Sequence, residues 1–368
     1  MILHSKNQTI TILVFIHIYF KYIFIKGVYM STKGFRRLLV SLAVVTSLAA
    51  SLYAKGKEKK YIIATASTGG TYYPVGVGIA TIASLKLAKK YKMTFSAITS
   101  AGSGENVDMI DKGEVDFAIL QGLFGSMAWQ GKAKYEGKPR KNLRSVTMLW
   151  QNVEQFTVKK EYAKTGNIMD LKNLYGKKFS IGGRNSGSRV SAETIMRSLG
   201  IDYNKMDLQY LGYTPSSTAL QDGKIVGMNT PAGVPTSAVT NAFATIGAKN
   251  LKILEFNEDN LKAIQKSWPV WTPYVIKSGT YPGLKEDVHT IAQPNLLVVR
   301  KDTPPETVYL LTKTIYENLP FLHTVHKATK AMSLQKAIDG LPMPLHPGAA
   351  KYYKEQGIKI PDRLIAKD

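Results

Sequence analysis

The chain has 368 residues, of which 44% are hydrophobic and 20% charged, and it contains no cysteine. This length allows two domains of ordinary size, and the composition is that of a globular protein rather than a disordered one. The missing cysteines exclude disulfides, thiolate zinc sites, CxxC redox centres and a cysteine nucleophile. The formal charge of +23 favours an anionic partner or ligand. Because the lysines are spread out and no zinc-finger or RNP-like motif is present, an acidic ligand is a better prediction than nucleic acid.

The first 54 residues differ from the rest and predict an export leader. From Met30 a basic stretch is followed by the apolar residues 38–48 and then by small residues that end at Ala54. The apolar run is shorter than the roughly 20 residues that span a bilayer, and this order is typical of a secretory signal peptide. We expect cleavage after Ala54 or Ala49, and an uncleaved amino-terminal anchor is the alternative.

Residues 10–25 form a second apolar stretch, which His17 and Lys21 interrupt. Because such a segment is unusual directly before a complete signal peptide, we expect Met30 to be the true start and residues 1–29 an over-extended reading frame. A transmembrane helix is the alternative. Removing residues 1–54 takes away six basic residues and no acidic one, so the formal charge falls from +23 to +17.

Beyond the leader, short β-rich runs alternate with helical ones. A first series predicts strands at residues 61–67, 94–100 and 116–121 and helices at 75–91 and through Asp111. The pattern then restarts with strands at 178–182, 207–213, 225–230 and 251–256 and helices at 189–199, 214–222 and 234–244. A strand at 295–299 and helices after Thr303 and Pro347 follow. These repeats predict two α/β halves, each with a parallel or mostly parallel sheet covered by helices.

Three loops each lie between a predicted strand and a helix, and each combines glycine with hydroxyl side chains. They are residues 67–74, 100–106 and 182–189. The first turn of a helix has unpaired N–H groups and a partial positive charge, so it can hold a carboxylate or phosphate. Glycine allows close approach, and Ser or Thr adds a donor. One such loop can be an ordinary capped helix start, but three of them in both halves favour an anion site beyond the strand ends.

Motifs for the common enzyme classes are missing from the sequence. It contains no GxxxxGK[ST] phosphate loop, no GxSxG elbow and no HExxH zinc motif. His323 and His326 could in principle share a metal, although an ordinary helix face is the better interpretation. His346 is expected to cap a helix or to lie in a turn. We therefore predict no catalytic residue, no metal and no cofactor.

Six segments resemble the TAXI-type solute receptors of tripartite ATP-independent periplasmic (TRAP) transporters, and they occur in the right order. They are TGGTYYP (68–74), SAGSGENVDMIDKGEVDFAILQ (100–121), GGRNSGS (182–188), AGVP (232–235), SGTYPG (278–283) and DGLPMPLHPGAAKYY (339–353). The resemblance runs from about Ile62 to about Gly357, which is nearly all of the chain after the leader.

The resemblance implies an α/β, type II periplasmic-binding-protein fold with two lobes, a ligand cleft and a hinge of two crossovers. Residues 55–150 and 265–368 would form the first lobe, and residues 151–264 the second. Carried over residue by residue, the ligand-binding positions of the first lobe are Thr68, Gly69, Gly70, Thr71, Tyr72, Ser103, Asn106 and Gln121. Those of the second lobe are Ser186, Gly187, Ser188 and Gly233.

The function that the resemblance implies is that of a periplasmic, non-enzymatic receptor. It would capture a small organic acid, such as glutamate or a dicarboxylate, and deliver it to the membrane subunits of a TRAP-type transporter. Two rival hypotheses are an enzyme on the same fold and a ligand-sensing domain for a membrane sensor. The chain departs from the family pattern at Arg184 and Arg189, where small or acidic residues are commoner, and at residues 150–154. The arginines are either charge partners of an anion or solvated surface residues.

Overall fold

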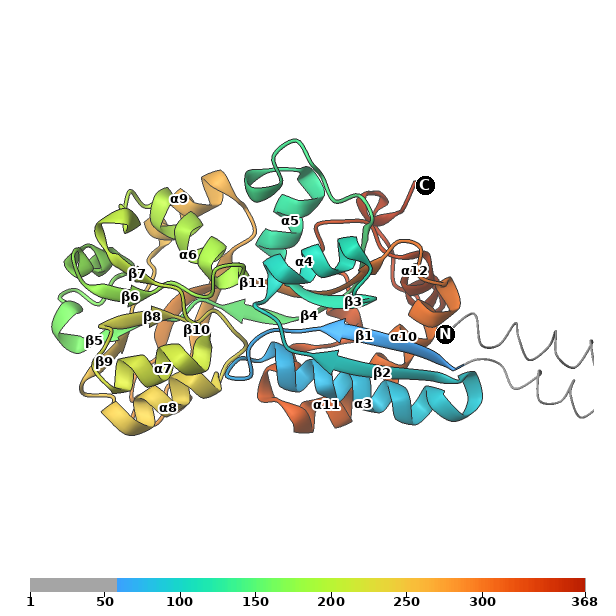
Figure 1. The fold of residues 1–368 in the computed structure, drawn as a ribbon, viewed down its shortest axis with the longest axis horizontal. Coiled ribbons are helices and arrows are strands. Elements are labelled where there is room, and N and C mark those ends of the chain that lie inside the picture. Colours follow the sequence, from blue (N-terminus) through green and yellow to red (C-terminus); the bar gives the residue numbers. More distant parts are fainter. Residues whose placement is uncertain (1–57, 368) are drawn as a thin grey trace, which may run out of the picture. The chain divides into compact units, whose positions relative to one another are not determined.

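The computed structural model describes residues 58–367 and arranges them around two β-sheets, each covered by helices (Figure 1). The predicted leader, the start at Met30 and both expected cleavage positions lie outside the described residues. Between residues 58 and 367, no helix is long and apolar enough to cross a membrane. The predicted α/β class with two lobes is confirmed.

The first sheet takes its strands from both ends of the described chain. They are β1 (Lys59–Ala64), β2 (Met93–Ile98), β3 (Phe117–Gln121), β4 (Leu143–Val153), β10 (Thr272–Ile276) and β11 (Val288–Arg300). β1 is parallel to β2 and β3, whereas β11 is antiparallel to β3, β4 and β10. The expected mostly parallel sheet is therefore wrong here. β11 brings the chain back from the second sheet, so it runs against the strands of the strand–helix–strand units.

The second sheet is built from the middle of the chain and has the strand order β7-β6-β8-β5-β9. Its strands are β5 (Phe156–Lys159), β6 (Lys178–Ser180), β7 (Asp207–Gln209), β8 (Gly227–Asn229) and β9 (Leu251–Ile253). β6 is parallel to β7 and β8, but β5 is antiparallel to β8 and β9. This sheet is also mixed, because β5 enters directly from the first sheet rather than through a helix.

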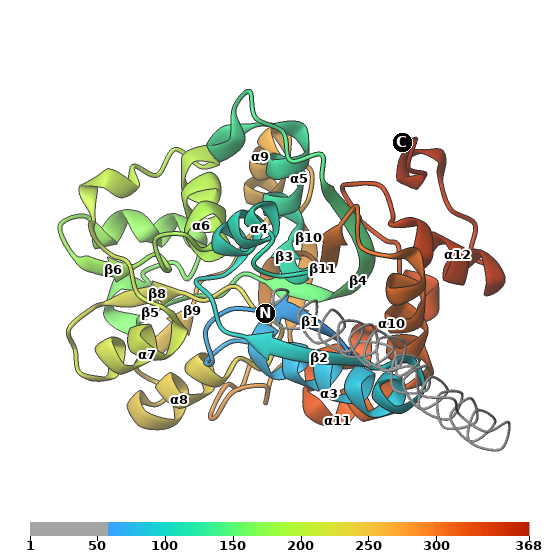
Figure 2. The same ribbon diagram turned by 45° about the vertical axis from the view of Figure 1, so that its right-hand side comes forward.

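Helices cover both faces of each sheet. They are α3 (Tyr72–Tyr91), α4 (Ser103–Lys112), α5 (Gly122–Gln130), α6 (Gly187–Ser198), α7 (Tyr213–Gln221), α8 (Ser237–Ile246), α9 (Glu258–Ser267), α10 (Pro305–Glu317), α11 (Leu319–Val325) and α12 (Pro347–Glu355). In both ribbon views α3 and α11 lie on one side of the first sheet and α4 on the other (Figure 2). In the second sheet α7 and α8 lie opposite α6.

Short 3-10 helices complete the connections. They are η1 (Ala133–Tyr135), η2 (Lys160–Tyr162), η3 (Ile168–Leu174), η4 (Tyr203–Lys205), η5 (Lys327–Ala331), η6 (Leu334–Lys336) and η7 (Asp362–Leu364). The predicted strands and helices all exist, and most of them begin within a few residues of the expected position. His346 caps α12, as expected, because its Nδ1 accepts the N–H of Gly348 at 3.2 Å.

Two crossovers connect the sheets. Glu154 and Gln155, the first crossover, join β4 to β5. The second crossover is β11, because Val288 and Ala292 pack in the core of the second lobe whereas residues 295–299 pair with β3 of the first sheet. Glu154, Gln155, Ala292 and Asn295 are completely buried. The crossovers therefore run through the interior where the lobes meet. The predicted lobe boundaries, residues 55–150 with 265–368 and residues 151–264, stay a prediction.

The packing of α12 against α10 generates a stability prediction. A Cβ at Gly348 would lie 2.1 Å from the carbonyl oxygen of Pro305 and 2.8 Å from the backbone nitrogen of Tyr309. Because these are backbone atoms, they cannot rotate away. We expect Gly348→Ala to lower the free energy of unfolding by about 1–3 kcal/mol in urea denaturation. Lys354→Ala, an exposed position on the same helix, should change it by less than about 0.5 kcal/mol, and equal effects would contradict this account.

Candidate functional site

A cavity of about 170 Å³ lies between the two lobes where four helices begin. Tyr72 and Ser103 open α3 and α4 of the first lobe and line the cavity. Gly187 and Tyr213 open α6 and α7 of the second lobe and line it from the other side. The N–H groups of a first helical turn have no carbonyl partner within the helix and carry a partial positive charge. The cavity therefore gathers neutral hydrogen-bond donors from both lobes.

Most of these helix starts lack a side-chain cap, although the Glu105 N–H in the first turn of α4 donates to the carbonyl of Asn185 at 3.1 Å. The starts of α3, α4 and α7 have no side-chain cap. Only α6 is capped, because the hydroxyl oxygen of Ser186 accepts the N–H of Arg189 at 3.2 Å while its proton goes to the carbonyl of Gly183 at 2.7 Å. The first two N–H groups of α6, those of Gly187 and Ser188, still lack a helical partner. The cavity is thus lined by the starts of four helices, each with first-turn N–H groups that have no helical partner.

Two tyrosine hydroxyls form the buried wall of the cavity. Burial raises the pKa of both Tyr72 and Tyr213 above the ordinary tyrosine value, so both remain protonated at neutral pH. The Tyr72 hydroxyl donates to Oδ1 of Asn295 at 2.5 Å, and that of Tyr213 donates to the carbonyl of Pro231 at 2.5 Å. Since the Tyr213 proton is used there, the Ser188 hydroxyl donates to the Tyr213 oxygen, at 2.8 Å. These bonds fix both rings against the cavity.

The cavity lining is uncharged but contains an unpaired acceptor. None of the residues that line it carries a formal charge. Gln121 is 3% exposed, and its Oε1 has no hydrogen-bond partner among the described residues. A buried acceptor without a partner costs about 1–3 kcal/mol, so this atom marks a position where a ligand donor would be favourable. The site thus offers many donors and at least one acceptor.

The structure brings half of the predicted binding residues to this cavity. Tyr72, Ser103, Gln121, Ser186, Gly187 and Ser188 line it. Thr68, Gly69, Gly70, Thr71, Asn106 and Gly233 do not. Thr68 is exposed, whereas the other five are buried.

Several of the predicted residues outside the lining join the lobes instead. The hydroxyl of Thr71 donates to the carbonyl of Gly233 at 2.9 Å, which is a bond from one lobe to the other. Gly69 lies so close to α7 that a Cβ there would be 2.4 Å from Oγ1 of Thr214, and Gly70 packs against the same helix. Their lack of side chains permits the close approach of α7 to the loop before α3.

Asn106 has all of its side-chain hydrogen bonds within the first lobe. Its Nδ2 donates to the carbonyls of Thr65 and Ile119, at 2.8 Å each, and its Oδ1 accepts from the Ser100 hydroxyl at 2.6 Å. The residue therefore holds the loop before α4 against β1 and β3. It is positioned to support the site rather than to contact a ligand.

The helix start at α7 was not predicted as part of the site. Gly212, Tyr213 and Pro231 line the cavity, yet none was among the predicted binding residues. The signal was present, because Gly212-Tyr213 also lies between a strand and a helix. It was weaker than in the other three loops because it has one glycine and no cluster of serine or threonine before the helix.

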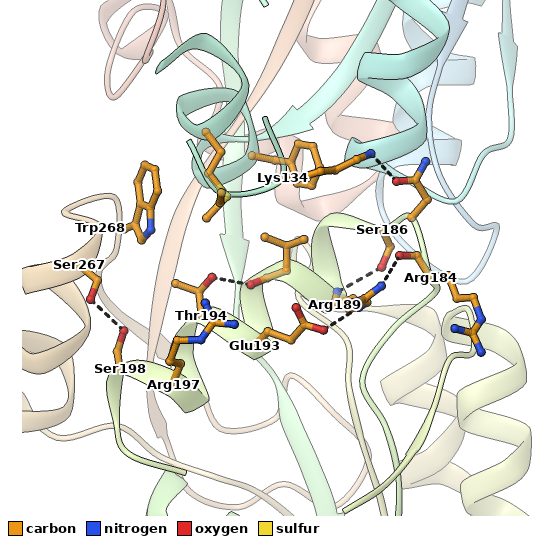
Figure 3. Close-up of a pocket in the computed structure, with 15 residues that line it drawn as sticks. Lys134, Arg184, Ser186, Arg189, Glu193, Thr194, Arg197, Ser198, Ser267 and Trp268 are labelled. Atoms are coloured by element: carbon orange, nitrogen blue, oxygen red, sulfur yellow. Dashed lines mark hydrogen bonds and ion pairs between the residues drawn. The ribbon is translucent and has the colours of Figure 1, made fainter. Parts of the chain in front are cut away.

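A wider groove of about 700 Å³ adjoins the cavity and shares Ser186 with it. Lys134 reaches across the groove from η1, and its Nζ donates to Oδ1 of Asn185 in the loop before α6, at 2.8 Å. Figure 3 shows Trp268 at one end of this groove and Arg184 near the other. The groove collects more basic than acidic side chains, and it is formed by both lobes.

Arg184 and Arg189 belong to this outer groove and do not line the inner cavity. Both guanidinium groups lie over the ring of Tyr210, with 4.3 and 5.4 Å from their central carbons to its centroid. Arg189 also forms an ion pair with Glu193, at 2.6 Å. The two arginines thus have local partners in the second lobe.

Two α/β lobes joined by two buried crossovers, with a small cavity between them, form the periplasmic-binding-protein fold, so the predicted fold class is confirmed. The chain belongs to the NMT1-like family, whose model matches residues 63–357.

Solved structures similar to this one include three proteins of low sequence identity. MatC from Rhodopseudomonas palustris, with bound malate, has a TM-score of 0.50 and 14% identity, covering 80% of this chain and 98% of that one. The periplasmic binding protein BugD has a TM-score of 0.49 and 15% identity, covering 82% and 95%. The periplasmic aliphatic sulphonate binding protein SsuA from Escherichia coli has a TM-score of 0.40 and 12% identity, covering 81% and 84%.

The bonding of Asn106 generates a prediction that separates support from ligand contact. Asn106→Ala would remove the amide donor of two buried carbonyls, of which that of Thr65 also accepts the Ser100 hydroxyl at 3.0 Å. We therefore expect the free energy of unfolding to fall by about 1–3 kcal/mol in chemical denaturation. The matched control is Asn241→Ala, at an exposed position of α8, which should change stability by less than about 0.5 kcal/mol. A fully stable Asn106→Ala protein would show that these bonds are not important.

Proposed function

We propose that the protein is a periplasmic receptor that binds a small organic acid in the 170 Å³ cavity and delivers it to a TRAP-type membrane transporter. The observation that carries this proposal is the meeting of four helix starts, three of them without side-chain caps, at one cavity between the lobes. The transporter class rests on the resemblance of the sequence motifs to TAXI-type receptors.

A carboxylate suits this cavity because its lining supplies donors without supplying a cation. Backbone N–H groups at helix starts bind anions through both their hydrogen bonds and the partial charge of the helix. When the lobes exclude water, the lower local dielectric strengthens these charge-assisted bonds. The size of the cavity favours a small acid over a peptide or a nucleotide, since sites for drug-sized ligands are commonly about 300–1,000 Å³.

The acid that fits best also carries a hydrogen-bond donor. The unpaired Oε1 of Gln121 is an acceptor, which a second carboxylate would repel and a hydroxyl or ammonium group would satisfy. Malate, the ligand of MatC, has two carboxylates and one hydroxyl, and glutamate has two carboxylates and one ammonium group. Both therefore match the proposed donor and acceptor pattern.

Ligand contacts from both lobes explain how binding would signal to a transporter. An acid held by α3 and α4 on one side and by α6 and α7 on the other stabilises the closed arrangement over an open one. The Thr71 bond to Gly233 is made only when the lobes are together. A membrane partner that recognises the closed arrangement would thus select the loaded receptor.

The ligand class is tested by a thermal-shift screen of the leaderless protein. L-malate, L-glutamate and succinate are the test acids, and glucose and arginine are controls. We expect L-malate or L-glutamate to raise the melting temperature more than succinate does, because each carries a donor for Oε1 of Gln121. A ligand at about 100 times its Kd adds about 2.7 kcal/mol to stability. A shift with glucose or arginine alone would refute the acid proposal.

The position of the site is tested by a matched pair of glycine substitutions. A Cβ at Gly187 would lie 2.7 Å from both Oε1 of Gln121 and Oγ of Ser103, which belong to the first lobe. A Cβ at Gly183 would have no heavy atom nearer than the Cβ of Ser186, at 3.9 Å. We expect Gly187→Ala to weaken binding of the acid at least tenfold by calorimetry, about 1.4 kcal/mol. Arg184→Ala, outside the cavity lining, should stay within about twofold of the parent affinity, and Gly183→Ala, at a lining position where the added Cβ has room, should lose less affinity than Gly187→Ala. Equal losses in all three variants would move the site elsewhere.

A further inference from the structure

Asn185 lies in the loop before α6 and bonds to the first lobe through both its side chain and its backbone. Its Nδ2 donates to Oδ2 of Asp108 in α4 at 3.0 Å, and its Oδ1 accepts a hydrogen bond from Nζ of Lys134 in η1 at 2.8 Å. Its backbone carbonyl accepts the N–H of Glu105, in the first turn of α4, at 3.1 Å. One residue of the second lobe therefore has three bonding partners in the first.

The two side chains from the first lobe fix the orientation of the Asn185 amide. Nζ of Lys134 lies 3.2 Å from Oδ2 of Asp108, so the ammonium, the carboxylate and the amide form a closed triangle. An ammonium group only donates and a carboxylate only accepts, so the amide oxygen faces Lys134 and the amide nitrogen faces Asp108. An aspartate in place of Asn185 would have the same shape but no donor for Asp108.

The backbone of Asn185 also packs closely against the start of α4. A Cβ at Gly104 would lie 2.5 Å from both the carbonyl oxygen and Oδ1 of Asn185. Nearby, a Cβ at Gly187 in α6 would lie 2.7 Å from Oγ of Ser103 in α4. Ser103 and Gly187 line the cavity, whereas Asn185 does not. Asn185 therefore joins the starts of α4 and α6 just outside the cavity.

This contact is exposed enough to be broken and remade. The side chains of Lys134 and Asp108 are 37% and 33% exposed, and Asn185 is half-buried. Charge-assisted bonds at such positions are screened by water and contribute little individually. The bonds of Asn106, in contrast, are buried within one lobe. The contact of Asn185 is thus suited to opening when the lobes separate rather than to stabilising either lobe.

We propose that Asn185 is a positioning residue that locks the start of α6 to the start of α4 when the lobes meet, and that it slows release of the bound solute without touching it. Its partners lie in the first lobe, so the lock adds to the stability of the closed arrangement alone. A smaller closed fraction weakens binding in proportion. The effect on the solute rests on the proposed function, whereas the lock does not.

Amide hydrogen exchange in the free protein tests the lock. The Glu105 N–H has its acceptor in the second lobe, whereas the Asn106 N–H donates to the carbonyl of Gly102 within the first lobe, at 3.0 Å. Exchange of Glu105 therefore reports separation of the lobes, and exchange of Asn106 reports opening of α4 itself. We expect Asn185→Asp to raise the exchange rate of Glu105 about three- to tenfold, measured by nuclear magnetic resonance, and to leave that of Asn106 unchanged.

A second substitution distinguishes the lock from a general effect of charge or structure. Asp108→Asn alone should have a small effect, because its amide oxygen still accepts. In the Asn185→Asp protein, however, Asp108→Asn supplies a donor to the new carboxylate and should return Glu105 exchange to within about twofold of the parent. Asn204→Asp, at an exposed position of the second lobe, is the charge control and should change nothing. A double variant without recovery, or equal rises for Glu105 and Asn106, would overturn the proposal.

The effect on the solute is tested with L-malate as the probe, through its dissociation rate in stopped-flow measurements. We expect Asn185→Asp to raise this rate about three- to tenfold and the double variant with Asp108→Asn to return it to within about twofold of the parent. An unchanged rate in Asn185→Asp would overturn the link between the lock and release. A failure of malate to bind the parent would count against the proposed function, and the exchange experiment would still decide the lock.

Discussion

The N–H groups at the start of a helix have no partner within the helix, and this constraint organises the whole interface between the lobes. Four helix starts, from α3, α4, α6 and α7, lie against one small cavity. Of these four helices only α6 has a side-chain cap, in which the Ser186 hydroxyl oxygen accepts one of the unpaired N–H groups. Burying the remaining N–H donors without a hydrogen-bond partner would lower the stability of the fold. Water or the proposed anion would complete the site, and an anion would do so with both hydrogen bonds and charge.

The absence of charged side chains from the cavity has a consequence for how an anion is held. A lysine or arginine would bind an acid from one lobe alone, because a full charge needs no second partner. Neutral donors are individually weak and become effective when several act together away from water. Gly187 permits this arrangement, since it brings the α6 backbone against Gln121 and Ser103 of the other lobe. Uncharged donors from two lobes would thus make binding of the proposed acid depend on closure.

The loops that line the site could be predicted because their signal is local. Glycine and serine between a strand and a helix report backbone geometry, and this information survives without tertiary contacts. The loop sequences could not reveal which groups each side chain bonds to. Asn106 and Thr71 lie in the predicted loops, yet one bonds within its own lobe and the other bonds to Gly233. Tyr213 was missed because a single glycine before α7 is a common helix start.

The strands that carry the crossovers were harder to predict for a related reason. β4 buries polar residues alongside apolar ones, among them Arg144, Ser145, Thr147 and Asn152. It therefore lacks the alternation of apolar and polar residues that identifies a strand with one solvent-exposed face. β11 was expected at residues 295–299, but it begins at Val288 and passes through Pro294, next to an irregularity in its pairing with β4. Proline normally indicates a strand end. Both strands therefore depend on contacts between distant parts of the chain.

The polar character of this interior is costly if stability alone is considered. Asn152, Glu154, Asn229 and Gln293 are buried in or beside the crossovers and keep unpaired atoms, and replacing such groups with apolar ones often stabilises a protein. Apolar packing would, however, favour one arrangement of the lobes at every pH and in every ligand state. Unpaired amides and a carboxyl whose pKa burial raises to about 7 leave room for alternative bonding patterns. A receptor of the proposed kind, which captures and releases its ligand, would use two such arrangements.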